Sequence, residues 1–533
     1  MPRHRLASDS WAKSPSAIAK GMLQRLVIVL ISCLSHPALG LPESLSAERI
    51  TTRSGLEVLQ YTGIRFAQAP EGQFRWRAPR SVNEPEQLEG WPPACMQDDR
   101  TSNWYAMVAT GVDGDTSKVP QTPAVSEDCL FLNVWTPTQK SATKRPVLVW
   151  IYGGSNRSGW SYEPDYRGQE LAARGVVVVS IAYRVGLFGF LAHPELSAES
   201  PHGSSGNYGL LDQIEALKWI NEHIASLGGD PGNVTIFGES AGAGNIGYLL
   251  ATPLADGLFH KAILQSGGWA ITQQRTLADD EKEGLALSEQ TDMSIEQLRQ
   301  LSATDMLRLQ QQNYQRGYDD PPIDGWLLPK TPAELMQRKD LPTRPVLLGS
   351  NADESLMYLN NPTLKNWQQA IASYAAQDQV WLEEKFGTLP IAQRLNLLGS
   401  AVSFYCPTLA TAQALYQAVS PAYVYRFDRI RDNAQRIGAY HGAEIPYVFG
   451  THADWLSTND EDWALTEKMM GMWLSFAETG APAQSQDWPI WDRNACGISL
   501  NTQTTPVRLD TELCEHLGFS LQVAALAEPD ICQ

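Results

Sequence analysis

The stretch Asn233–Asn245, NVTIFGESAGAGN, places a serine between a short apolar run and a series of small residues. The apolar run favours a buried β-strand, and the alanines and glycines after it favour a closely packed helix. Between them, residues 238–242 read Gly-x-Ser-x-Gly and centre on Ser240. A serine on such a strand-to-helix turn is strained, with its hydroxyl exposed, which is the arrangement of a nucleophile elbow. We therefore predict that Ser240 is a nucleophile.

Other apolar runs surround this stretch, and several are apolar throughout, as strands covered by helices on both faces are. Residues 211–227 carry apolar residues at steps of three and four and end at two glycines, which predicts an amphipathic helix. Alternation of strand and helix predicts an α/β fold with a large, mostly parallel central sheet and helices on both faces. The predicted strands are Arg145–Gly154, Gly175–Arg184, Asn233–Ser240, Lys261–Gly267, Arg344–Asn351 and Ala422–Asp428.

Two long segments have helical spacing without strand-like runs. Residues 269–343 are rich in Gln, Leu and Asp, and residues 360–419 have a similar pattern. We predict that both are helical insertions over the end of the sheet that carries the active site. The expected organisation is thus one domain over residues 41–533.

A serine hydroxyl needs a neighbouring base before it can attack a carbonyl carbon. In elbow architectures the partners follow in the order serine, acid, histidine. His441 lies in a glycine-flanked loop after a predicted strand, whereas His452 and His516 lie in polar, less constrained settings. His441 is therefore the predicted base.

The acid that orients this histidine should follow a strand between Ser240 and His441. Asp353 and Glu354 both come directly after the predicted strand that ends at Asn351. The pattern alone leaves the choice between these two carboxylates open.

The sequence YGGSN, residues 152–156, follows another predicted strand. Attack on a carbonyl creates an oxyanion, which backbone N–H groups must already face. In this architecture one donor follows the nucleophile, here Ala241, and others come from a glycine-rich turn after an earlier strand. Gly154 and Ser155 are the predicted donors of that turn.

The N-terminal residues resemble an export signal. Basic residues end at Arg25, an apolar run follows, and residues 36–40 read HPALG. We predict a cleaved signal peptide over residues 1–40, with Met22 as an alternative start, and a secreted or periplasmic protein. A lipoprotein signal at Cys33 is the alternative. The apolar run is too short for a stable transmembrane span.

The formal net charge is −18 over 533 residues, although the first forty residues are basic. An acidic surface should repel nucleic acid and anionic membranes, so neither is an expected partner. Without Cys33, an even number of cysteines remains, which favours disulfides over buried free thiols in an exported chain. The cysteine and histidine spacing predicts no metal site, and no cofactor or oligomeric state is indicated.

Nine blocks occur along the chain in a fixed order: GIRFAQAP, EDCLFLNVW, VLVWIYGG, AYRVGLFGFL, GNYGLLDQ, GGDPGNVTIFGESAG, ILQSG, NADES and HGAEIPYVFG. Together they resemble the type-B carboxylesterase and cholinesterase family of α/β-hydrolases over about Ile50 to Leu521. The chain looks most like the secreted bacterial carboxylesterases of this family, including those that remove ester side chains from mycotoxins.

The resemblance implies a catalytic triad of Ser240, Glu354 and His441, so it selects the glutamate over Asp353. It also implies disulfides Cys95–Cys129 and Cys406–Cys514, which leaves Cys496 and Cys532 for a third. The oxyanion donors fall on Gly154, Ser155 and Ala241.

Two positions depart from the family pattern. Ser155 replaces the third glycine of the oxyanion turn, and Ser355 replaces the glycine after the acid. The Ser155 side chain should narrow the site and disfavour bulky esters.

The resulting hypothesis is a serine carboxylic-ester hydrolase that forms an acyl-enzyme with small-molecule esters. An amidase or carbamate hydrolase would use the same triad, and a non-catalytic binding domain of this superfamily is a further alternative. The sequence does not indicate which ester is the natural substrate.

Overall fold

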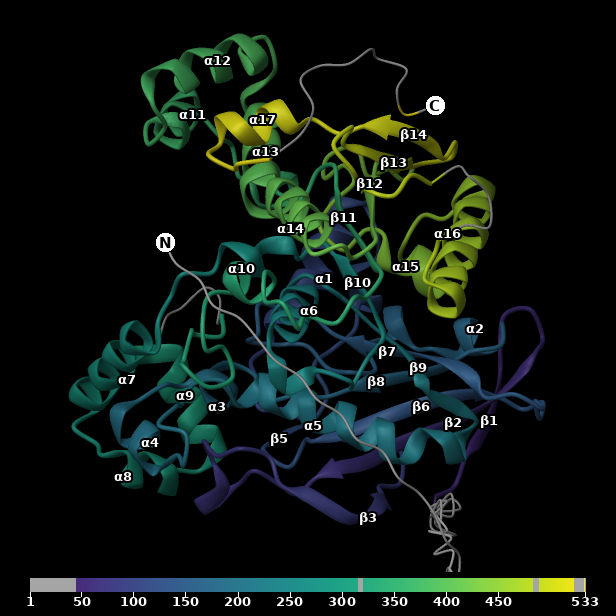
Figure 1. Cartoon of the computed structure of the whole chain (residues 1–533), viewed down its shortest axis with the longest axis vertical. Coiled ribbons are helices and arrows are strands. Elements are labelled where there is room, and N and C mark those ends of the chain that lie inside the picture. The colour runs from purple at the N-terminus through teal and green to yellow at the C-terminus, as the bar shows by residue number, and fades with distance from the viewer. Residues whose placement is uncertain (1–44, 315–319, 483–487, 522–531, 533) are drawn as a thin grey trace, which may run out of the picture. The chain divides into compact units, whose positions relative to one another are not determined.

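The six strands predicted from apolar runs form the centre of a mixed sheet (Figure 1). The computed structural model describes residues 45–314, 320–482, 488–521 and 532, and the predicted signal peptide and Cys33 lie outside these residues. Within them the strand order is β1-β2-β6-β8-β7-β9-β10-β11-β12-β13-β14, with β3 paired to β2. The central strands are β7 (Arg145–Ile151), β8 (Val177–Ile181), β9 (Gly229–Glu239), β10 (Lys261–Gln265), β11 (Val346–Asn351) and β12 (Ala422–Phe427).

Neighbouring strands are parallel from β8 through β7, β9, β10, β11 and β12 to β13, which confirms the predicted class. At both margins of the sheet the strands pair antiparallel, and the sequence patterns did not predict these marginal strands. The marginal strands are β1 (Glu48–Thr51), β2 (Glu57–Ala67), β3 (Ser81–Gln87), β6 (Phe131–Pro137), β13 (Cys496–Leu500) and β14 (Thr505–Arg508). A separate small sheet pairs β4 (Ala94–Cys95) with β5 (Val125–Ser126).

Large side chains on adjacent strands form the core on one face of the sheet. Trp150 pairs in register with Phe237, and Phe237 pairs with Ile263, so the three side chains point to the same face. Phe449 covers them, with its ring centre 4.9 Å from that of Trp150 and 5.3 Å from that of Phe237. Burying each such side chain contributes about 1.5–3 kcal/mol.

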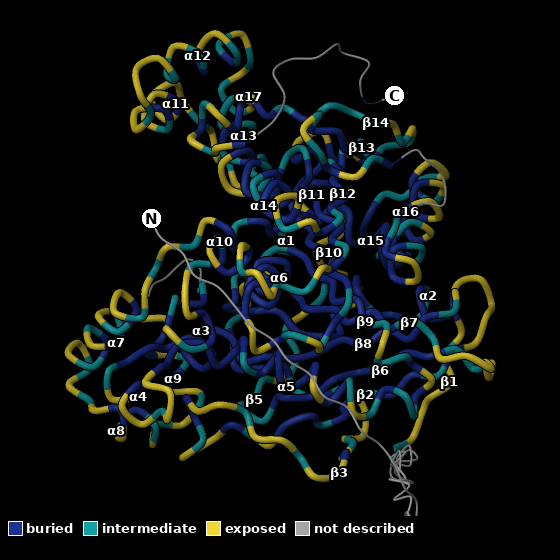
Figure 2. The backbone as a smooth tube through the Cα atoms, in the orientation of Figure 1, coloured by how far each residue is buried: buried dark blue, intermediate teal, exposed yellow. Residues whose placement is uncertain are grey.

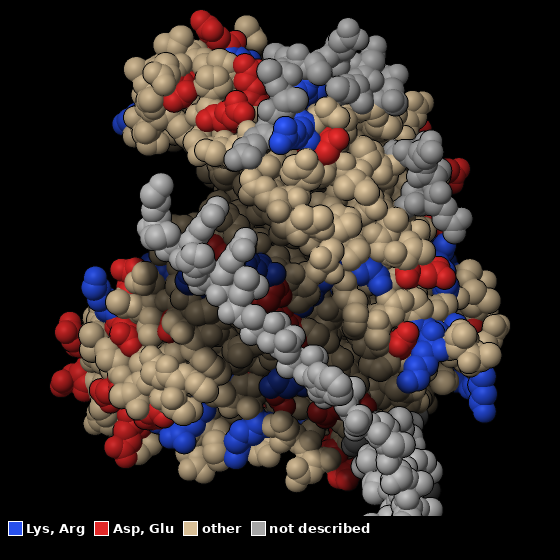
Figure 3. Space-filling view, viewed as in Figure 1, with Lys and Arg blue, Asp and Glu red and all other residues tan. Residues whose placement is uncertain are grey.

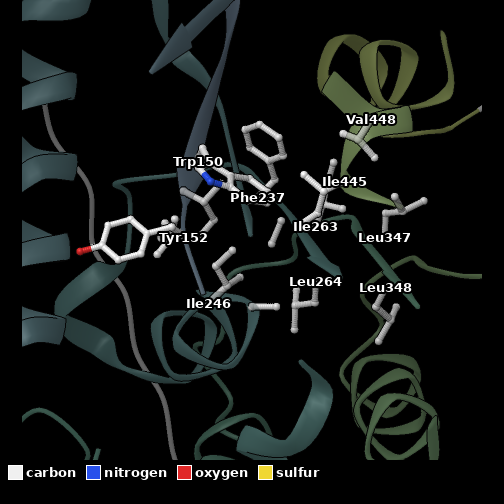
Figure 4. Close-up of a cluster of buried hydrophobic side chains, with 14 of the residues drawn as sticks. Trp150, Tyr152, Phe237, Ile246, Ile263, Leu264, Leu347, Leu348, Ile445 and Val448 are labelled. Atoms are coloured by element: carbon white, nitrogen blue, oxygen red, sulfur yellow. The ribbon is translucent and has the colours of Figure 1, made fainter. Parts of the chain in front are cut away.

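On the opposite face, Leu264 and Leu348 lie toward Ile246 of α6, as Figure 4 shows. Helices thus cover both faces of the central strands, which are buried over most of their length (Figure 2). The helices outside the two predicted insertions are α1 (Arg100–Gly111), α2 (Gln169–Ala172), α3 (Gly186–Phe190), α4 (Pro194–Glu199), α5 (Tyr208–His223), α6 (Ala241–Ala251), α15 (Ile445–Phe449), α16 (Asp460–Thr479) and α17 (Thr511–His516).

Both segments predicted as insertions are helical in their described residues. Residues 269–343 contain α7 (Leu277–Thr291), α8 (Ile295–Gln300), α9 (Ala303–Asn313) and α10 (Pro332–Leu335). Residues 360–419 contain α11 (Leu364–Ile371), α12 (Ala376–Phe386), α13 (Ile391–Ser400) and α14 (Cys406–Gln417). The first segment packs against α3, α4 and α6.

Acidic side chains gather over α7 and α8 on the face drawn in Figure 3, with basic side chains interspersed elsewhere. Of the helices that the structure describes, none combines the length and the apolar character needed to cross a bilayer.

Candidate active site

The turn after β9 holds Ser240 in a strained backbone conformation. Its φ of 52° and ψ of −127° are unusual for a residue with a side chain, and α6 begins directly after it. The Ser240 N–H donates to the Gln265 carbonyl oxygen at 2.9 Å. A β-carbon at Gly238 or Gly242 would collide with the Ile151 carbonyl oxygen, which explains the small residues on both sides of the serine. This is the geometry predicted for a nucleophile elbow.

His441 lies in the loop between β12 and α15, and its Nδ1 is 2.6 Å from Glu354 Oε2. Glu354 follows β11 and is fully buried, and its Oε1 accepts the Asn351 N–H at 2.7 Å. A buried carboxylate held in this way can fix the imidazole tautomer and orientation.

The adjacent Asp353 has a different set of partners. Its Oδ2 accepts the Ala439 N–H at 2.9 Å, and its Oδ1 accepts from Asn396 at 2.8 Å. It thus holds the loop that carries His441, while Glu354 contacts the imidazole itself. The structure therefore separates the two carboxylates that the sequence pattern left open.

The other two candidate histidines are engaged elsewhere. His452 Nδ1 lies 2.7 Å from Arg431 Nη2, and burial lowers the pKa of His452 to about 2. His516 Nδ1 lies 2.7 Å from Asp378 Oδ1, beside α12. Neither belongs to the site that contains Ser240.

Glu239, the residue before Ser240, is a site residue that the sequence patterns did not single out as functional. Its Oε1 lies 3.2 Å from His441 Nε2, opposite the Glu354 contact. The side chain is buried, and burial raises the pKa of Glu239. Only its place in the Gly-x-Ser-x-Gly sequence could have pointed to it.

Burial alone would lower the pKa of His441. The carboxylates of Glu239 and Glu354 outweigh that effect and raise this pKa above its ordinary value. A third buried carboxylate, Glu444, accepts from Gln265 at 2.9 Å and from Asn351 at 2.7 Å, and its pKa is raised by burial. The histidine is therefore set among acidic side chains that stabilise its charged form.

The turn after β7 packs against the turn that carries Ser240. A β-carbon at Gly153 would lie 2.9 Å from Ser240 Cβ and 2.8 Å from the Glu239 carbonyl oxygen. Gly154, Ser155 and Asn156 have φ values of 99°, 59° and 57°, all in the left-handed region. Glycine adopts this region without strain, which is the physical reason to expect a third glycine where Ser155 stands.

Ser240, His441, Glu239 and Ser155 line one pocket of about 430 Å³. Aromatic side chains form much of its wall. They are Trp104, Tyr105, Trp150, Tyr166 and Tyr358. The Trp104 indole N–H donates to the Tyr358 hydroxyl at 3.2 Å across the pocket.

Part of the pocket wall comes from α1, which lies between Cys95 and Cys129. Among the described residues that line the pocket, none belongs to residues 269–343 or 360–419. The second of these segments nevertheless lies beside the site, because the Phe404 ring is 4.8 Å from that of His441.

Disulfides join Cys95 to Cys129, Cys406 to Cys514 and Cys496 to Cys532. The first two pairs are those that the family resemblance implied, and the third joins the two cysteines that remained. The first closes the segment that carries α1, and the second ties α14 to α17.

Comparisons with known proteins agree with this geometry. Residues 46–516 match the profile of the Carboxylesterase family. The chain is 34% identical over 481 residues to a fumonisin B1 esterase of Sphingopyxis macrogoltabida, covering 84% of each chain. It is 32% identical over 463 residues to a para-nitrobenzyl esterase of Bacillus subtilis (strain 168), covering 83% of this chain and 90% of the relative.

A solved PNB esterase structure superposes with a TM-score of 0.74 at 29% identity, covering 89% of this chain and 99% of that structure. The elbow, the parallel sheet and the similarity over most of the chain lead to one conclusion: the chain is an enzyme of the carboxylesterase family.

Proposed function

We propose that the protein hydrolyses small-molecule carboxylic esters through a triad of Ser240, His441 and Glu354. The observation that carries the proposal is the contact of 2.6 Å between His441 Nδ1 and the buried Glu354, in a pocket shared with the strained Ser240. Triads are recognised by this arrangement of nucleophile, base and orienting acid.

In the proposed mechanism, His441 Nε2 removes the proton from Ser240 as its oxygen attacks the ester carbonyl carbon. The N–H groups of Gly154, Ser155 and Ala241 stabilise the oxyanion that forms. Collapse of this intermediate expels the alcohol, which takes the proton from His441. Water then attacks the acyl-enzyme with His441 again as the base, and the acid product leaves.

The pocket supports a preference for esters of modest size with an apolar or aromatic part. Its volume of about 430 Å³ lies in the range of small-molecule sites. Aromatic walls favour apolar or aromatic acyl or alcohol groups. Relatives named for fumonisin B1 and for para-nitrobenzyl esters support this substrate class.

We also propose that the protein is exported to the periplasm or beyond the cell. The disulfides in the described residues are compatible with an oxidising compartment. The N-terminal signal pattern supports the same conclusion. Detection of the chain in the periplasmic or culture fluid, with an N-terminus near residue 41, tests it.

The function is tested by comparing Ser240→Ala with the wild-type chain on p-nitrophenyl butyrate. We expect kcat to fall by at least about 10³-fold, because no other group can replace the nucleophile. Ser226→Ala, which alters a serine outside the pocket, is the control and should keep wild-type turnover. Full activity of Ser240→Ala would overturn the proposal.

A further inference from the structure

Two buried asparagines connect the turn after β7 to the helix that begins after Ser240. Asn156 is 1% exposed, and Asn245 of α6 is fully buried. Asn156 Nδ2 donates to Asn245 Oδ1 at 3.2 Å, and Asn245 Nδ2 donates to Asn156 Oδ1 at 2.9 Å. The two amides thus form a reciprocal pair in which each side chain is both donor and acceptor.

The turn needs such support because of its conformation. Ser155 and Asn156 have side chains but adopt the left-handed region, with φ of 59° and 57°. That region is unfavourable for residues other than glycine, and asparagine is one of the few that tolerate it. Other contacts also hold Asn156: its carbonyl oxygen accepts the Gly186 N–H at 2.7 Å, and its Oδ1 accepts from the Tyr183 hydroxyl at 3.3 Å.

The other half of the pair is coupled to the nucleophile. The Gly244 N–H donates to the Ser240 carbonyl oxygen at 2.9 Å, so the first turn of α6 fixes Asn245 relative to Ser240. On the opposite side, Asn156 directly follows Ser155 in the chain. The amide pair therefore connects the proposed oxyanion donor at Ser155 with the helix that supplies the donor at Ala241.

We propose that Asn156 and Asn245 are positioning residues that hold the two halves of the oxyanion hole in register. This inference rests on the proposed function, because it needs an oxyanion to form at Ser240. Donors stabilise a transition state only when they already point at the developing charge. A displacement of about 1 Å in a catalytic arrangement can cost about 100-fold in rate.

The pair should act as a unit. Removing Asn156 leaves the buried Asn245 amide without its reciprocal partner, and removing Asn245 leaves Asn156 Oδ1 with the Tyr183 hydroxyl but without the Asn245 N–H. Either loss favours a local shift of the turn. Once the turn has shifted, removal of the second amide should cause little further displacement of the oxyanion donors. The effects of Asn156→Ala and Asn245→Ala on transition-state stabilisation should therefore not add.

The test compares wild type, Asn156→Ala, Asn245→Ala and the double variant. Three quantities are measured: kcat and KM for p-nitrophenyl butyrate, and the inhibition constant of an alkyl trifluoromethyl ketone, which forms a hemiketal anion with an active serine. We expect each single variant to lower kcat by about 10- to 100-fold and to raise the inhibition constant of the ketone by a similar factor. KM should change by less than about threefold. The double variant should have a kcat and a ketone inhibition constant similar to those of either single variant.

Gln60→Ala is the matched control for loss of a buried amide. Gln60 accepts from the Trp135 indole at 2.9 Å, between strands β2 and β6. Its removal should lower the thermal stability of the protein without weakening the binding of the ketone. Asn156→Asp keeps the side-chain volume but places a carboxylate oxygen opposite Asn245 Oδ1. If Asn156→Ala does not fold, we expect Asn156→Asp to show the same changes in kcat and in the inhibition constant.

The inference is overturned if the folded Asn156 and Asn245 variants bind the ketone as tightly as wild type and lose only thermal stability. Failure of the proposed function looks different. In that case the wild-type chain would not bind the ketone, and Ser240→Ala would keep its turnover, which overturns both proposals together.

Discussion

His441 Nε2 lies 3.2 Å from Glu239 Oε1, and Glu239 is the residue directly before Ser240. The imidazole is therefore held between two buried carboxylates, Glu354 at Nδ1 and Glu239 at Nε2. Both carboxylates favour the protonated ring, and their effect exceeds the opposite effect of burial. An imidazole held in this way keeps its proton to higher pH than an ordinary histidine. If His441 is the base, as proposed above, the pH dependence of activity reports this shift.

The Glu239→Gln variant should move the acidic limb of the kcat/KM profile to lower pH. His441 must be neutral to accept the Ser240 proton, so activity falls as pH drops below its pKa. Removing the Glu239 charge destabilises the imidazolium and lowers this pKa by about one unit or more. Stopped-flow or steady-state rates across pH measure the shift.

Glu84→Gln, on exposed β3, is the control and should leave the limb in place. A limb that stays in place, or moves to higher pH, in Glu239→Gln would contradict this electrostatic account.

Glu354→Gln and Asp353→Asn should differ strongly although the residues are neighbours. Glu354 contacts the imidazole, whereas Asp353 contacts the main chain at Ala439. Loss of the orienting carboxylate should lower kcat by about 10³- to 10⁴-fold, and Asp353→Asn should lower it by less than about tenfold. Equal losses in the two variants would show that the proposed division between these carboxylates is wrong.

Replacing Ser155 by glycine should widen the range of accepted esters. The Ser155 side chain lines the pocket, and its φ of 59° is a conformation that glycine adopts without strain. We expect kcat/KM for branched acyl esters to rise by about tenfold relative to acetate esters, with no loss of stability. A panel of p-nitrophenyl esters measures the ratio.

Ser155→Ala separates size from polarity, because it keeps the β-carbon and removes only the hydroxyl. If the steric explanation holds, this variant resembles wild type on bulky esters. An unchanged ester profile in Ser155→Gly would mean that Ser155 has no role in selectivity.

Glu163 should make the protein less stable as pH rises from about 5 to about 7. Burial raises the pKa of Glu163 from 4.5 to about 7, so between these values the folded chain holds a proton that the unfolded chain has released. Folding stability therefore falls with rising pH across this window, by up to about 3 kcal/mol for this group.

In Glu163→Gln the amide mimics the protonated acid, since its oxygen can still accept the Trp160 N–H. The decline in the urea midpoint between about pH 5 and pH 7 should be smaller in this variant than in wild type. An identical decline in both proteins would rule out Glu163 as its source.

Local patterns predicted the central sheet and the nucleophile turn because their causes are local. The second half of β9 is apolar and buried, and Ser240 requires small neighbours, so both signals lie in consecutive residues. The antiparallel margins lacked such a signal, because β2 mixes buried and half-buried residues without a regular alternation and its place depends on pairing with distant β6.

The carboxylates around His441 could not be assigned from their immediate sequence. Glu354 and Asp353 are adjacent, and only the fold decides which one faces the ring. Glu444 belongs to the network through Gln265 and Asn351, which come from two different strands. Such contacts depend on how strands β10, β11 and β12 lie beside one another, so they become visible only in three dimensions.

The most direct test of the central claim is to label the intact protein with a fluorophosphonate probe and map the adduct by peptide mass spectrometry. We predict one dominant adduct, on Ser240, whose formation is strongly slowed in His441→Ala and prevented in Ser240→Ala. Absence of labelling in the folded wild-type protein, or a dominant adduct on another residue, would contradict the assignment of Ser240 as the nucleophile.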